Sequence, residues 1–192
     1  MSYSADITKA VNSIRTRSRP LDLMNRRVLV ENMCFVYQFI LASERLLYEA
    51  KMQASGDLRD YYAAHHDEER GHAEWLARDL LSAGIDVATI PRSRTAIAMA
   101  GGQYYLMKHV SPAALLGYML VLEGCPTPMA QVEALEHAHG KELLRTLRHH
   151  SLHDIDHGAE LRKVIDSMSD PAIMESAMQT AIYLNEFQQE LQ

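Results

Sequence analysis

Apolar residues recur at intervals of three and four along most of the chain, and no stretch alternates between apolar and polar residues for long enough to indicate a strand. The pattern therefore predicts an all-α fold. A first long helix is expected over about residues 23–54 and ends before Gly56. Because residues 33–42 are nearly all apolar, this helix is expected to be buried on most of its sides.

Glycine and proline residues mark where the next helix ends. A second helix is expected over about residues 57–83, closed by Gly84. Residues 85–102 contain Pro91 and the pair Gly101 and Gly102, which are typical of a connection. Only a short helical piece is therefore expected there.

The second half of the chain has clearer helix boundaries. Ser111 followed by Pro112 predicts a helix start, because proline is favoured at the first helical position, and that helix is expected to end at Gly124. The pattern is helical again from residue 129 to about residue 169, with one weak point at Gly140. Asp170 then predicts the cap of a last helix that runs to the C-terminus. Such elements form a bundle of long helices, in which sites are built from side chains on facing helices.

The length and charge of the chain narrow the class of protein. A chain of 192 residues fits one domain, so a single helical domain is expected over residues 1–192. The net charge of -6 argues against a nucleic-acid-binding protein, because phosphate contacts need a basic surface. Residues 1–22 are basic and are expected to be a solvated lead-in. We find neither a secretory signal nor an apolar run of about 20 residues, so we expect a cytoplasmic protein with no membrane segment.

The most unusual stretch is HHSLHDIDHGAEL, residues 149–161. In a helix, positions i, i+4 and i+7 share one face, so His150, Asp154 and His157 are expected to point the same way from an otherwise apolar stripe. Burying three ionisable groups there is costly unless they bind a cation that takes neutral imidazole and ionised carboxylate. His149 and His153 fall on other faces and are expected to be solvated.

The predicted second helix repeats this arrangement in HHDEERGHAEW, where His65, Glu69 and His72 stand at i, i+4 and i+7. An acid three residues before a histidine is weak evidence alone, because a chain of this composition contains about one such pair by chance. Three pairs occur. The one formed by Glu136 and His139 is set aside, because it lies beside a helix-weakening glycine.

Two isolated glutamates complete a candidate ligand set. Glu44 lies within an apolar helical face, and Glu123 is the only charged residue of its predicted helix. Two helices that each supply a glutamate and two that each supply an acid-x-x-His motif form the carboxylate di-iron or di-manganese arrangement. Zinc fits less well, because the set is rich in carboxylates, lacks thiolates and is too large for one tetrahedral ion.

The stretches HHDEERGHAEWLARDLLSAGIDV, LGYMLVLEG and HHSLHDIDHGAEL resemble those of the heme-oxygenase-like di-iron oxidases and oxygenases, a family of iron-containing redox enzymes. The resemblance spans roughly residues 46–168 and implies the multi-helix bundle of the heme-oxygenase-like fold. Its most specific part is HSLHDIDH, which has the family's pattern of His, three residues, Asp, two residues and His. True heme oxygenase activity is not implied, because the N-terminal helix contains no histidine to bind heme.

The resemblance implies six metal ligands in this chain. They match the family position by position and are Glu69, His72, Glu123, His150, Asp154 and His157. His150 separates this pattern from that of ferritin-like di-iron proteins, which have no histidine four residues before the acid. Whether Glu44 or His65 adds a further ligand stays open at this point.

The resemblance also implies a cofactor and a reaction class. Two iron ions with open coordination positions pass electrons to O2, the co-substrate, while the protein orients the substrate and excludes water. Manganese is the alternative metal. The expected substrate is a small carboxylate- or amine-bearing metabolite, oxidised by C–C cleavage, desaturation or N-oxygenation. An external electron donor is a further expected partner, and the amphipathic C-terminal helix suggests a homodimer.

Two other functions stay open. A ferritin-like iron-binding bundle would share most of the ligands, but iron storage would need a large oligomeric shell. A metal-free domain of the thiaminase-like fold would use the pocket for chemistry without a cofactor or for simple binding. The spacing disfavours the metal-free domain, because a pocket that binds no metal has no reason to align six ionisable groups.

Overall fold

The computed structural model describes residues 2–192, and these residues form helices and connections without a strand among them. The all-α prediction is therefore confirmed. The α-helices are α1 (Tyr3–Arg15), α2 (Arg26–Gln53), α3 (Gly56–Glu69), α4 (His72–Ser82), α5 (Arg94–His109), α6 (Leu115–Glu123), α7 (Met129–His139), α8 (Arg145–Met168) and α9 (Pro171–Glu190). Short 3-10 helices, η1 (Val87–Thr89), η2 (Pro112–Ala114) and η3 (Lys141–Leu143), lie in the connections.

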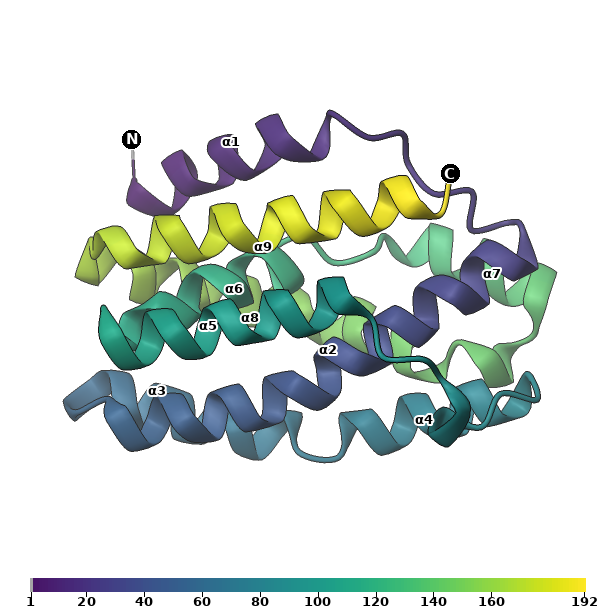
Figure 1. Ribbon diagram of the computed structural model, residues 1–192, viewed down its shortest axis with the longest axis horizontal. Helices are drawn as coiled ribbons and strands as arrows, with labels where there is room; N and C mark the ends of the chain where they lie inside the picture. Colours follow the sequence, from purple (N-terminus) through teal and green to yellow (C-terminus); the bar gives the residue numbers. More distant parts are fainter. Residues whose placement is uncertain (1) are drawn as a thin grey trace.

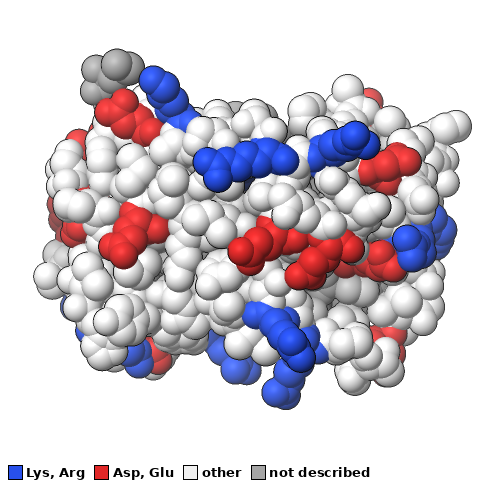
Figure 2. Space-filling view, turned by 45° about the horizontal axis from the view of Figure 1, so that its top comes forward, with Lys and Arg blue, Asp and Glu red and all other residues white. Residues whose placement is uncertain are grey.

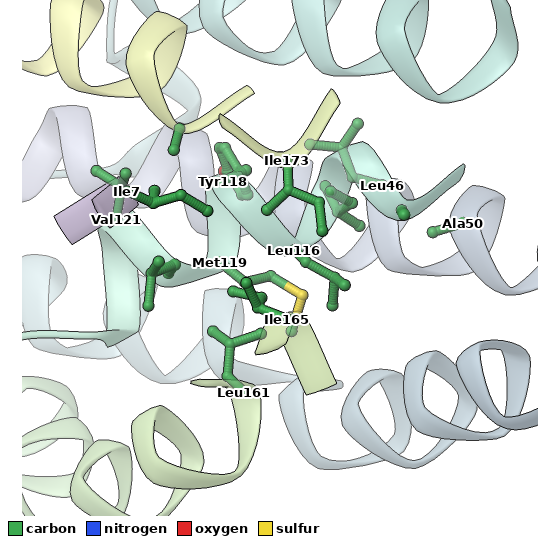
Figure 3. Close-up of a cluster of buried hydrophobic side chains, with 14 of the residues drawn as sticks. Ile7, Leu46, Ala50, Leu116, Tyr118, Met119, Val121, Leu161, Ile165 and Ile173 are labelled. Carbon is green, nitrogen blue, oxygen red and sulfur yellow. The ribbon is translucent and has the colours of Figure 1, made fainter. Parts of the chain in front are cut away.

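Helix α6 lies at the centre of the main hydrophobic core. Every residue from Leu115 to Val121 is buried, and these side chains meet others from α1, α2, α8 and α9 (Figure 3). Gly117 permits the closest approach, because a Cβ atom there would lie 2.0 Å from the carbonyl oxygen of Ile173 in α9. Backbone contact with α9 therefore fixes the direction in which the end of α6 points.

Several predicted helix boundaries are confirmed. Helix α2 lies within three residues of the predicted range at each end, and α6 ends where Gly124 was expected to end it. At the start of α9, the Asp170 carboxylate accepts a hydrogen bond of 2.9 Å from the backbone N–H of Ala172. This bond satisfies one of the free donors of the first helical turn.

The expectation of a solvated lead-in is wrong for residues 3–15. They form α1, which packs against α9 and buries Ile7, Val11 and Ile14 at 0 to 4% exposure. These residues stand at i, i+4 and i+7 and so share one helical face, while Lys9 stays exposed. Full burial of such a side chain contributes about 1.5–3 kcal/mol, so the apolar stripe outweighs the basic residues.

Two predicted long helices are each broken at a glycine. The range 57–83 divides into α3 and α4, because Arg70 is extended and Gly71 has a φ of 92°. The range 129–169 divides into α7 and α8 at Gly140, whose φ is 93°. Both values lie in the left-handed region, which glycine reaches without steric cost. Helices α3 and α4 then follow each other along one edge of the molecule (Figure 1).

The expectation of only a short helical piece near residues 85–102 is also wrong. Residues 94–109 form the full helix α5, which continues through Gly101 and Gly102. A Cβ atom at Gly102 would lie 2.0 Å from the Gln179 amide nitrogen, so this glycine leaves room for the Gln179 side chain of α9. The buried Gln103 side chain also donates to Thr180 at 3.2 Å. These contacts with α9 override the low helix propensity of the glycine pair.

The surface view and the helix lengths give two further observations. Figure 2 shows acidic and basic side chains together on the face that carries α1, so this face has no continuous basic area for nucleic acid. Within residues 2–192, no helix is both long enough and apolar enough to cross a membrane.

Candidate metal centre

Ionisable side chains from four helices gather where α3, α4, α6 and α8 meet. They form two groups, in each of which one ligand atom per residue lies within 4.8 Å of the others. The first group, here called the Glu123 group, is His65, Glu123 and His157. The second, called the His72 group, is Glu69, His72 and His150. Each group combines side chains of three different helices.

The break between α3 and α4 positions two members of the His72 group. Helix α3 ends with Glu69 and α4 begins with His72, so the backbone changes direction between them at Arg70 and Gly71. The two side chains nevertheless remain in contact, with His72 Nδ1 2.9 Å from Glu69 Oε2. Both are buried. The glycine therefore sets how the imidazole at the start of α4 faces the carboxylate at the end of α3.

Glu123 is the last residue of α6, and neighbouring contacts hold that helix end in place. Arg162 of α8 donates a hydrogen bond of 2.5 Å to the Gly124 carbonyl. A cation here satisfies a free carbonyl and complements the negative end of the helix dipole. Gly158 of α8 lies against this helix end, since a Cβ atom there would be in ordinary contact, at 3.4 Å, with the Glu123 carbonyl oxygen. Glu123 is thus presented to α8 at a fixed position.

The first two turns of α8 are anchored on both sides of His150. The Asp79 carboxylate of α4 accepts a hydrogen bond of 2.8 Å from the backbone N–H of Thr146. Burial raises the pKa of Asp79, although this bond works in the opposite direction. The Ser151 hydroxyl donates to the Thr127 carbonyl at 2.5 Å. These bonds fix the rotation of α8 and therefore the face on which His150 lies.

Two buried ligand atoms lack both a hydrogen bond and an ion pair among residues 2–192. They are His150 Nε2 and His157 Nδ1, whereas Glu123 Oε2 lies 3.2 Å from His65 Nε2. An unpaired buried polar atom costs about 1–3 kcal/mol, so two in one place need an explanation. A cation bound by their lone pairs would remove this cost in both groups. The residues present therefore fit a metal centre.

Burial and neighbouring charges shift the pKa values of several members of these groups. Burial opposes the charged form of His65, but the hydrogen bond and charge of Glu123 outweigh burial and raise the pKa of His65 to about 9. Burial also disfavours ionised Glu69, yet the bond from His72 and the nearby imidazoles lower its pKa. Against the cost of burial, Asp154 at 3.2 Å raises the pKa of His150. A metal ion would bind here in exchange for protons.

The structure brings the six predicted ligands into one region but leaves Glu44 outside it. Asp154 belongs to neither three-residue group, and its Oδ1 instead lies 3.2 Å from His150 Nδ1. Glu44 is half-buried, does not line the neighbouring cavity and joins neither group. The apolar face around Glu44 therefore does not by itself place it at the site.

The structure adds two residues that the motif match did not select. His65 lies in the Glu123 group, with its Nε2 3.2 Å from a Glu123 oxygen. Its helical register with Glu69 was the only pattern in the sequence that indicated it. The Tyr61 ring stacks on His65 with 6.0 Å between centroids, and burial raises the pKa of this tyrosine. No sequence pattern singled out Tyr61.

Glu68 occupies the outer edge of the Glu123 group. Its Oε2 lies 3.4 Å from His157 Nε2, and its side chain is 57% exposed. Metal-binding histidines usually donate their second ring N–H to a carboxylate, which fixes the tautomer. His157 has this arrangement, because its Nδ1 is buried without a partner while its Nε2 faces Glu68.

A cavity of about 270 Å³ adjoins the two groups. Its wall is mostly apolar and comes largely from α2, α6 and α8, with Glu69, Glu123, His150 and Asp154 on one side. Small-molecule pockets start at about 300 Å³, so the cavity suits a compact ligand. None of the residues that line it is Lys or Arg.

Comparison with known proteins identifies related sequences and folds. The sequence model of a family described as iron-containing redox enzymes matches residues 36–184. That segment contains every member of the Glu123 and His72 groups. A search of curated proteins gave no match.

Two solved structures share the fold. A domain of unknown function with a heme oxygenase-like fold from Shewanella denitrificans OS217 is 15% identical, with a TM-score of 0.70 over 97% of this chain and 89% of that chain. A TenA homolog from Pseudomonas syringae pv. tomato str. DC3000 is 11% identical, with a TM-score of 0.78 over 99% of this chain and 93% of that chain. At these identities the likeness concerns the fold alone, and the predicted heme-oxygenase-like fold is confirmed.

Proposed function

The chain belongs to the family of iron-containing redox enzymes, and on this premise we propose that it is a non-heme di-iron oxidase or oxygenase. One iron ion would be held by the Glu123 group and the other by the His72 group, with Asp154 beside them. Imidazole and carboxylate ligands suit iron, and manganese is the alternative metal. When bound, ferrous ions supply the electrons that reduce O2.

The observation that carries this proposal is the pair of ligand groups with unpaired buried atoms in both. His157 Nδ1 belongs to one group and His150 Nε2 to the other. One ion would leave the atom of the second group without a partner. Two ions satisfy both of them, which favours a two-metal centre over a single ion.

The cavity supports a small organic substrate beside the metals. Its apolar wall would bind the carbon skeleton and exclude water. Because no Lys or Arg lines the cavity, a carboxylate head group would be neutralised only at the metal centre. An amine head group would instead face Glu69, Glu123 and Asp154. We therefore propose a compact carboxylate- or amine-bearing metabolite as substrate, and an external electron donor where the oxidation needs further electrons.

The test is an anaerobic titration of ion-free protein with Fe2+, followed by exposure to O2. We expect two tightly bound ions per chain. Glu123→Gln and Glu69→Gln should each weaken one of the two sites by about 10–100-fold, the range found when a group that supports metal binding is lost. Glu44→Gln is the matched control, because this carboxylate lies outside both groups, and it should keep two ions.

The O2 step separates the proposal from its alternatives. An oxidase should consume O2 faster when a suitable amine or carboxylate is added to the iron-loaded protein. Two bound ions without such consumption across a broad panel would leave an iron-binding bundle instead. If added iron changed neither the melting temperature nor any activity, a metal-free domain would be the correct description.

A further inference from the structure

Two imidazoles in the stretch at residues 149–153 lie outside both ligand groups. His149 and His153 stand four residues apart on α8, and their ring centroids are 4.2 Å apart. His153 is exposed, whereas His149 is half-buried. The expectation that both are solvated is therefore wrong for His149, which packs against α4.

The ring nitrogens of this pair have no protein partner. Within residues 2–192, no hydrogen bond or ion pair involves His149 or His153, whereas six other histidines make one. His66 Nδ1 lies 3.1 Å from the Lys51 ammonium, and His139 Nε2 lies 3.0 Å from a backbone carbonyl. The pair therefore presents two imidazoles whose lone pairs are free to bind a ligand.

Ring contacts connect this pair with the metal centre. The His149 ring lies 5.3 Å from the ring of His72, a member of the His72 group. Trp75 packs against both rings. Its ring centroid lies 4.4 Å from that of His72 and 4.9 Å from that of His149, and the residue is 36% exposed. A row of imidazoles thus leads from the surface at His153 through His149 to the buried His72.

We propose that His149 and His153 form a capture site that binds a divalent transition-metal ion on its way to the inner centre. Neutral imidazole is a common ligand of such ions. With only two protein ligands, water completes the coordination, so the ion is held more weakly here than in a group of three. The ion can therefore move inward. The transfer of the ion to the inner centre rests on the proposed function, whereas its binding to His149 and His153 does not.

Trp75 makes the proposal testable, because it is the only tryptophan of the chain and contacts imidazoles of both sites. Co2+ is mixed anaerobically with ion-free protein in a stopped-flow instrument, and the quenching of Trp75 fluorescence is followed. We expect a fast phase from capture and a slower phase from inner binding.

The double variant His149→Gln, His153→Gln should lose the fast phase. It should also load the inner centre about tenfold more slowly, because a raised local concentration of an ion increases its rate of binding by at least about tenfold. His137→Gln is the matched control, because this imidazole is exposed on α7, and it should change neither phase. A fast phase that survives in the double variant would overturn the proposal.

A second variant separates failure of capture from failure of the inner centre. Glu69→Gln with Glu123→Gln should keep the fast phase and lose the slow one. Loss of both phases, with no Zn2+-induced NMR shift of the His149 and His153 rings in that variant, would also overturn capture. If the wild-type chain binds a single ion, and the double histidine variant loses it, the capture site stands and the two-metal proposal fails.

Discussion

Gly71 has a backbone conformation that other residues adopt only at a cost. Its φ is 92°, and a Cβ atom there would lie 3.3 Å from a Glu74 carboxylate oxygen. We expect Gly71→Ala to lower the free energy of unfolding by about 1–2 kcal/mol and to weaken metal binding by the His72 group, because the start of α4 must shift. Denaturant unfolding and a Co2+ titration measure the two effects.

Gly101→Ala is the matched control for that substitution. Gly101 lies within α5, and a Cβ atom there would meet no atom within 4 Å. The free energy of unfolding should rise by about 0.5–1 kcal/mol, because alanine loses less backbone freedom in a helix. If Gly71→Ala behaved like Gly101→Ala, the turn at residues 70–71 would not be what positions His72.

Glu68 is expected to support metal binding from outside the ligand groups. Glu68→Gln removes the charge beside His157 Nε2 and should lower the affinity for Fe2+ by about tenfold, with little change in stability. Asp67→Asn is the control, because the neighbouring Asp67 carboxylate is 70% exposed and pairs with His66, which belongs to neither group. Isothermal titration calorimetry under anaerobic conditions measures both, and equal affinities would contradict this role of Glu68.

The raised pKa of His65 makes metal binding depend on pH. With a pKa of about 9 in the ion-free chain, His65 is protonated at pH 7, and it must lose that proton to bind a metal. Affinity should therefore increase as the pH rises from 7 towards 9 and then level off. Calorimetry in two buffers of different ionisation enthalpy should detect the released proton. A pH-independent affinity would mean that His65 is not a ligand.

At the scale of elements, the α6–α9 contact is the most sensitive packing feature. Gly117→Ala would place a methyl group 2.0 Å from the Ile173 carbonyl oxygen, so the two helices must separate. We expect a loss of about 3 kcal/mol in the free energy of unfolding, near the upper end for an overpacked core. Thermal unfolding measures it. A melting temperature like that of the wild type would show that α6 can shift freely.

The sequence predicts the helices better than their interruptions. The cap at Asp170 and the end at Gly124 follow from local chemistry and are confirmed. The break at Gly71 does not follow from such rules, since glycines also occur inside helices, as in α5. There α9 supplies contacts at Gly102 and Gln103 that favour the helix. Long-range packing therefore decides what each glycine does.

The sequence likewise predicts part of the candidate site. Helical register and the family motif indicate six residues that the structure gathers in one region. They do not indicate the partners that come from other helices. His149 meets α4 because α4 packs against α8, and Glu68 of α3 faces His157 of α8. One-dimensional spacing holds no information on these contacts.

At the scale of the whole molecule, the amphipathic C-terminal helix no longer supports the predicted homodimer. The apolar residues of α9, such as Ile173, Ala177 and Ala181, are buried inside the chain's own core. They are therefore not free to pair with a second chain. The homodimer stays a prediction, and light scattering after size exclusion should give twice the chain mass of 21.7 kDa. A mass of 21.7 kDa would contradict it, and a large shell would favour iron storage.

The interruption between α3 and α4 also bears on the stiffness of this edge of the molecule. Glu69 ends one helix and His72 begins the next, so an ion bound by both, as proposed, would cross-link the two helices. The stiffness of this edge would then depend on how much metal the protein contains. In the ion-free chain the turn between α3 and α4 would loosen first, while the core around α6 keeps its shape.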